Sequence, residues 1–263
     1  MKQFQQKIQA YLDDTTDKTS ILIQPLNSTF PLYEKDSHVQ MVSASTIKVP
    51  IMCCALHEVL HHKLALDQMI YVSQQDILSD SQVFEDGPTH MSLLDLIYWM
   101  IITSDNTATN ILIKTLGMNT INEYIQTELK VNSTKVERIM LDYEAVKQGK
   151  NNYTSQQDQM MIYTKLFNHE ILNKELCDLA LEILYAQRCQ DLIMRYIPYP
   201  VPYAHKTGEL DYLIHDCGVM TINQQLYYIG FSAYECKDIN GNTKLAGTIG
   251  KLIYDALKEN NHV

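Results

Sequence analysis

The spacing of apolar residues changes in character along this chain. Helical periodicity predicts helices at 3–13, 45–62, 92–102, 107–117, 119–129, 155–168, 173–187 and 243–259. Short apolar runs bounded by turn residues predict strands at 20–26, 30–36, 202–207, 214–222 and 226–236, with turns at 27–28, 223–225 and 240–241. The strands therefore lie near the two ends of the sequence, and helices fill the middle.

This order of elements predicts an α/β fold of the α+β type. Strands from the two ends must pair with one another, because unpaired strand edges promote association. The economical architecture is one antiparallel sheet covered by the two terminal helices, beside an all-helical lobe. We expect a discontinuous α/β lobe of residues 1–44 and 195–263 and a helical lobe of residues 45–194, with no internal repeat or linker.

Composition narrows the possible partners and compartments. The 263 residues are 46% apolar and 20% charged, with a formal net charge of −10. We therefore expect a globular protein that binds neither nucleic acid nor an anionic membrane. Its longest apolar stretch, Leu93–Ile102, is far shorter than the ~20 residues of a membrane-spanning helix. The N-terminus lacks the apolar core of a signal peptide, which indicates a cytoplasmic protein, or a secreted one from which a leader was removed.

The six cysteines form no CxxC pair. We expect them to be free thiols packed as small hydrophobic side chains, which suits a reducing compartment, although this pattern leaves room for one disulfide. Nothing in the sequence indicates the oligomeric state.

A serine and a lysine three residues apart, Ser45 and Lys48, stand at the start of the helix expected over 45–62. This spacing places the lysine amine on the same face as the serine hydroxyl. An amine that can lose its proton is what a serine nucleophile requires, and the helix start favours an oxyanion. The plain alternative is a serine that caps the helix, followed by a solvated lysine.

Two tripeptides extend this pattern. Ser104-Asp105-Asn106 lies between two helical segments, and Lys206-Thr207-Gly208 ends a strand-like run. Each has an ordinary structural interpretation, as a helix junction and as a strand exit. All three patterns in this order, however, are the signature of class A β-lactamases and penicillin-binding proteins. The sequence resembles that superfamily, and class A in particular, from about residue 20 to its C-terminus.

The resemblance implies a β-lactamase/transpeptidase-like fold with the site between two lobes. It also implies catalytic roles. Ser45 would attack a strained amide carbonyl and form an acyl-enzyme, and Lys48 would act as the base or help to activate it. Ser104 would pass a proton to the leaving nitrogen. The backbone N–H groups of Ser45 and Glu209 would form the oxyanion hole.

The same resemblance implies a substrate-binding set. Asn106 would bind the side-chain amide of the substrate. Lys206 and Thr207 would hold its carboxylate, and Gly208 would let it lie against the strand edge. No metal or other cofactor is implied.

The sequence departs from class A at the base for deacylation. That base is a glutamate two residues beyond a loop arginine, but two residues beyond Arg138 stands Met140. The nearest carboxylates are those of Glu144, our first candidate for the base, Asp142 and Glu137. Solvated loop carboxylates are the alternative, and the chain would then deacylate slowly.

A metal-dependent alternative comes from His57-Glu58-Val59-Leu60-His61, which matches the HExxH pattern of zinc proteases. Twelve residues of helix, about 18 Å, separate Ser45 from His57, so one site cannot contain both. The pattern has no third ligand, and we therefore predict no metal requirement. His205 and His215 are expected to be site-lining or strand residues.

These observations favour a serine hydrolase that opens β-lactam rings through acyl-Ser45. The alternatives are a D-alanyl-D-alanine peptidase or esterase with slow deacylation, and a penicillin-binding protein without turnover. The partner is a small β-lactam or an acyl-peptide.

Overall fold

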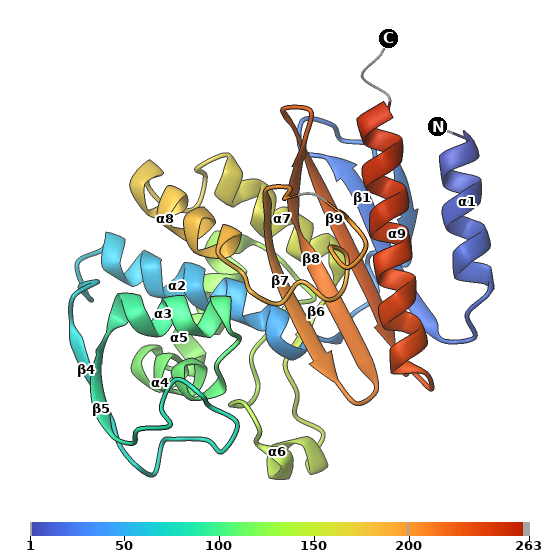
Figure 1. Cartoon of the computed structure of the whole chain (residues 1–263). Coiled ribbons are helices and arrows are strands. Elements are labelled where there is room, and N and C mark those ends of the chain that lie inside the picture. Colours follow the sequence, from blue (N-terminus) through green and yellow to red (C-terminus); the bar gives the residue numbers. More distant parts are fainter. Residues whose placement is uncertain (1, 199, 260–263) are drawn as a thin grey trace.

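The protein is described by a computed structural model covering residues 2–198 and 200–259. Its central sheet has five antiparallel strands in the order β2 (Tyr33–Lys35), β1 (Lys18–Pro25), β9 (Gln225–Tyr234), β8 (Leu213–Ile222) and β7 (Tyr203–Leu210). Strand β1 pairs directly with β9, which places Ile21 opposite Phe231. The expected pairing of strands from the two chain ends is confirmed (Figure 1).

Helices cover both faces of this sheet (Figure 1). On one face lie α1 (Lys2–Asp13) and α9 (Ile239–Glu259), which bury Phe4, Ile8 and Leu12 against the sheet. On the other lie α2 (Lys48–Leu60), α3 (Leu93–Ile102), α4 (Asn106–Leu116), α5 (Met118–Tyr124), α7 (Gln156–Phe167) and α8 (Lys174–Tyr185). Successive residues of a strand point to opposite faces, so Ile21 and Ile23 join the core under α1 and α9, whereas Leu22 joins the helical core. The expected α+β fold is confirmed.

Several expected elements differ in the structure. The strand expected at 30–36 is only Tyr33–Lys35, and the turn expected at 240–241 lies inside α9, where Gly241 N–H bonds to Asp238. The helix expected at 119–129 changes at Ile125 into a π-helix, Ile125–Leu129. Short elements within the middle segment were not anticipated: β3 (Met41–Val42) with β6 (Tyr153–Thr154), β4 (Met69–Val72) with β5 (Thr89–Ser92), and α6 (Tyr143–Lys147).

The two expected lobes, 1–44 with 195–263 and 45–194, remain a proposal. The inner face of the sheet, including Leu22 and Tyr228, packs into the same core as the helices. All six cysteines are free thiols, and four of them are buried. Among the described residues, no helix combines the length and the apolar character needed to cross a membrane.

Candidate active site

Ser45 lies in a tight turn between the sheet and the helical core. It is the second residue of a 3₁₀ turn, Ala44–Ile47, that leads into α2. The residue before it, Ala44, has a left-handed backbone with φ of 43°, a strained conformation that concentrates at functional sites. No side-chain cap bond is formed at this turn, so the interpretation of Ser45 as a helix cap is wrong. Its hydroxyl is half-buried and makes no hydrogen bond to another described residue.

Lys48 points from the first turn of α2 towards the Ser104-Asp105-Asn106 segment. Its ammonium is completely buried and donates to Ser104 O at 2.6 Å, Ser104 Oγ at 3.0 Å and Asn106 Oδ1 at 2.8 Å. Ser104 has a positive φ of 59°, which lets it present both oxygens to the amine. These bonds satisfy all three N–H donors of a lysine.

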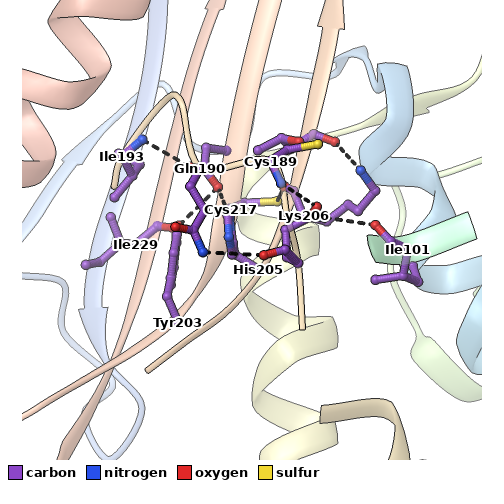
Figure 2. Close-up of polar contacts among 12 residues, drawn as sticks. Ile101, Cys189, Gln190, Ile193, Tyr203, His205, Lys206, Cys217 and Ile229 are labelled. Atoms are coloured by element: carbon purple, nitrogen blue, oxygen red, sulfur yellow. Dashed lines mark hydrogen bonds and ion pairs between the residues drawn. The ribbon is translucent and has the colours of Figure 1, made fainter. Parts of the chain in front are cut away.

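Lys206 reaches the same serine from β7. Its buried ammonium donates to Ser104 Oγ at 3.0 Å and to the carbonyl of Thr207 at 2.8 Å. Figure 2 shows Lys206 extending from its strand towards the helical side, on the opposite side of the strand from His205. One hydroxyl therefore joins two lysines from different parts of the fold.

Burial disfavours the charged form of both amines. Desolvation, helped by the positive charge of Lys206, holds the pKa of Lys48 well below its ordinary value. Desolvation also lowers the pKa of Lys206, to about 8. Burial thus lowers the pKa of both amines, and Lys206, with a pKa of about 8, remains mostly charged at pH 7.

Gly208 brings strand β7 against the turn that carries Ser45. A Cβ atom on Gly208 would lie 2.9 Å from the Ser45 backbone nitrogen and 3.1 Å from Ala44 Cβ. Because β7 is an edge strand of the sheet, its outer edge can receive an extended ligand. The contact places the Ser45 N–H beside the strand that carries Glu209.

We expect Gly208→Ala to slow acylation of Ser45 by about 10²-fold, because the methyl group must displace the turn from the strand. Acylation is measured by intact-protein mass spectrometry against time. Thermal unfolding of the variant close to that of the parent separates this effect from loss of the fold. Acylation at the parent rate would contradict the close approach.

A buried network supports β7 from behind. The carboxylate of Asp216 accepts from His205 Nδ1 at 2.7 Å, Tyr203 Oη at 3.3 Å and Ile193 N at 3.0 Å. The Tyr203 and His205 rings stack at 4.1 Å between centroids (Figure 2). His205 is thus a buried strand residue, as expected. It fixes the strand immediately before Lys206.

His215 connects the sheet to the segment just before Ser45. Its Nε2 lies 2.7 Å from the carbonyl of Val42 and its Nδ1 lies 2.6 Å from Ser232 Oγ. Burial lowers the pKa of His215 to about 4, so the ring is neutral at pH 7 and Nε2 donates to the carbonyl. The ring therefore anchors β3 three residues before Ser45.

The loop after Arg138 is tied to the same turn. The carbonyl of Asn152 accepts from Ser43 N at 2.8 Å, and its side-chain oxygen accepts from the backbone of Glu137 and Arg138. Further along the loop, Met140 is bonded in both directions to Asn110, which donates to its carbonyl and accepts from its N–H. Asn110 lies one turn of α4 beyond Asn106. Met140 is therefore held, buried, next to the helix that carries Asn106.

The structure places Glu144, the first candidate for the base, on a separate short helix. Glu144 lies on α6, its side chain is 77% exposed, and it pairs with Lys147 at 2.7 Å. Asp142 caps the same helix by accepting from Ala145 N, and Glu137 pairs with Lys135. Within this fully described loop, no carboxylate is hydrogen-bonded to Lys48, Ser104 or Asn106. The alternative of solvated loop carboxylates fits these positions better.

The HExxH histidines lie at the far end of α2. His57 Nε2 and His61 Nε2 are 3.1 Å apart, and Glu58 pairs with Lys63. Among the described residues, no group of three potential metal ligands occurs. The absence of a metal requirement stays a prediction.

The structure thus brings together Ser45, Lys48, Ser104, Asn106 and the strand carrying Lys206, Thr207, Gly208 and Glu209. Sequence reasoning missed the residues that position this group. Asn110, Asn152 and the Asp216 network act through contacts between distant segments, for which the sequence offers no local signal. It also missed Asp80, whose carboxylate accepts from Asn106 Nδ2 at 2.7 Å.

Comparison with known proteins identifies a family and a fold for this chain. Residues 3–257 match the model of the β-lactamase enzyme family. The chain is similar to β-lactamase VEB-1 of Pseudomonas aeruginosa, at 24% identity over 84% of this chain and 78% of that protein. A class A β-lactamase from Bacteroides cellulosilyticus has a similar fold, with a TM-score of 0.88 and 21% identity over 98% of both chains. So does PBP-A, with a TM-score of 0.87 and 22% identity over 98% of this chain and 97% of that one.

Proposed function

Because the chain belongs to the β-lactamase enzyme family, with a class A-like fold, we propose that it opens β-lactam rings through a covalent acyl intermediate on Ser45. The observation that carries this proposal is the pair of buried lysines that share the Ser104 hydroxyl beside the Ser45 turn. Outside a site, two buried amines that share one hydroxyl would be a costly arrangement.

The proposed reaction assigns one step to each of these groups. Ser45 Oγ bonds to the lactam carbonyl carbon while its proton passes to neutral Lys48. The resulting oxyanion accepts from the N–H groups of Ser45 and Glu209. The carbon–nitrogen bond then breaks, and Ser104 gives its proton to the leaving nitrogen and takes one from Lys48. Water hydrolyses the ester and regenerates Ser45.

The remaining residues bind the substrate in this proposal. Charged Lys206, with Thr207, holds the substrate carboxylate, and Gly208 leaves space for the ligand beside β7. Asn106 offers its amide to the side chain on the acyl group.

A second candidate is a D-alanyl-D-alanine peptidase or esterase, or a penicillin-binding protein without turnover. The position of Met140 favours slow deacylation, because the buried residue next to α4 has no basic group. Acylation is common to all these functions, and the rate of deacylation distinguishes them.

Incubation with a penicillin should add one covalent adduct, located on Ser45 by peptide mass spectrometry. Ser45→Ala should carry none, because the variant lacks the hydroxyl that we propose as the nucleophile. Ser43→Ala is the matched control and should still be acylated, since the buried Ser43 hydroxyl bonds only locally to the Ala44 carbonyl. An adduct that persists in Ser45→Ala would refute the assignment. With a chromogenic cephalosporin, steady turnover identifies a β-lactamase, and a single burst identifies a peptidase or a binding protein.

A further inference from the structure

The amide of Asn106 is already engaged on both sides in the free protein. Its oxygen accepts from Lys48 at 2.8 Å, and its nitrogen donates to Asp80 Oδ2 at 2.7 Å. Asp80 fixes the orientation of the amide, because a carboxylate can only accept. One N–H of Asn106 remains for a ligand, directly beside the carboxylate of Asp80.

The carboxylate of Asp80 is accessible to a ligand, whereas that of Asp105 is not. Asp105 is buried, caps α4 through Ala108 N and accepts from Ser81 Oγ. Asp80 is exposed and lines a cleft of about 400 Å³ with Ser104 and Asn106. Within the described part of the chain, Asp80 forms no ion pair with a lysine or arginine.

The cleft also contains one cation, Arg188, on another wall. Its guanidinium lies 5.9 Å from the centre of the Trp99 ring rather than against Asp80. The cleft therefore presents, next to the amide donor of Asn106, a carboxylate that forms no salt bridge with a described lysine or arginine. This pair matches a ligand with a carbonyl acceptor and, a few bonds away, a positively charged donor.

We propose that Asp80 binds an ammonium group on the acyl side of the substrate. The enzyme then prefers β-lactams and acyl-peptides that carry a free amine α to the side-chain amide carbonyl. In this arrangement the carbonyl accepts from Asn106 and the amine donates to Asp80. The inference rests on the proposed acylation of Ser45 and specifies its substrate class.

Two penicillins test this directly. Aminobenzylpenicillin and benzylpenicillin differ by one ammonium group at the α-carbon. We expect the first to acylate Ser45 about two- to fivefold faster at low ionic strength, the range for one ion pair in an exposed site. The preference should shrink as salt is added, because salt screens exposed charges. Acylation rates are measured by quenched-flow mass spectrometry.

Variants of Asp80 test whether its carboxylate causes the preference for aminobenzylpenicillin. Asp80→Asn should equalise the two rates, and Asp80→Lys should reverse their order. Asp86→Asn is the matched control, because it removes the same charge from an exposed residue of the same loop outside the cleft. It should keep the parent preference. Since each variant is judged by the ratio of two substrates, a general loss of activity does not imitate the result.

Equal rates for both penicillins in the parent protein, or an unchanged preference in Asp80→Asn, would overturn this inference alone. Absence of any Ser45 adduct with either penicillin would overturn the proposed function, and the inference with it.

Discussion

Replacing Lys48 with methionine should slow acylation of Ser45 by at least about 10³-fold, as expected when one member of a nucleophile–base unit is removed. Lys48 is completely buried and its three hydrogen bonds end on Ser104 and Asn106. Methionine has a similar length and no charge to desolvate, so the folded state should persist. Acylation is followed by mass spectrometry and folding by thermal denaturation.

Lys147→Met is a suitable control, because it removes an exposed amine that pairs only with Glu144. It should be acylated at the parent rate. Acylation of Lys48→Met within tenfold of the parent would show that another group takes the proton from Ser45.

The pH profile of acylation gives an independent test of the two amines. Burial holds the pKa of Lys48 below its ordinary value, so its neutral, basic form increases as pH rises through that lowered pKa. The pKa of Lys206 is about 8, and above it the amine loses the charge that binds a substrate carboxylate. For a carboxylate-bearing substrate we expect the acylation rate to rise with pH, pass through a maximum and then decrease as the pH exceeds about 8. For a substrate without the carboxylate, the acylation rate should not decrease above pH 8.

The candidate site residues could be predicted from the sequence because they form short local patterns. Ser45 and Lys48 are one helical turn apart, and Ser104 and Asn106 flank the start of a helix whose cap is Asp105. The antiparallel sheet was also predictable, because strands at the two chain ends need partners. The structure then adds the long-range step: Lys206 reaches Ser104 across 102 positions of sequence.

Local sequence patterns gave wrong predictions where the same residues could form either a turn or part of a helix. Asn240–Gly241 has turn chemistry, yet Asp238 caps that segment and the apolar face of α9 holds it helical. Glu144 lies on a short helix that the sequence did not predict, because Asp142 caps that helix and Lys147 pairs with Glu144 three residues on. Asp80 carries no signal at all, since its partner Asn106 lies 26 positions away across a loop.

Met140→Glu should accelerate hydrolysis of acyl-Ser45 by about 10²-fold or more, the usual contribution of a positioned general base. The loop backbone at this position is already fixed by two hydrogen bonds to Asn110, so a new carboxylate would be held beside α4. Because Met140 is only 7% exposed, burial would raise the pKa of that carboxyl and make it a stronger base. The measurements are steady-state turnover of a chromogenic cephalosporin and the lifetime of the adduct.

The loop carboxylates provide the matched comparison. Glu144→Gln and Asp142→Asn should leave turnover unchanged, because Glu144 pairs with Lys147 at the surface and asparagine can replace aspartate as a helix cap. A longer-lived adduct in Glu144→Gln would show that α6 moves to bring this glutamate to the ester. An unchanged adduct lifetime in Met140→Glu would show that position 140 does not face the acyl group. In that case water assisted by Lys48 would limit turnover, and the peptidase or esterase function would take precedence over the β-lactamase one.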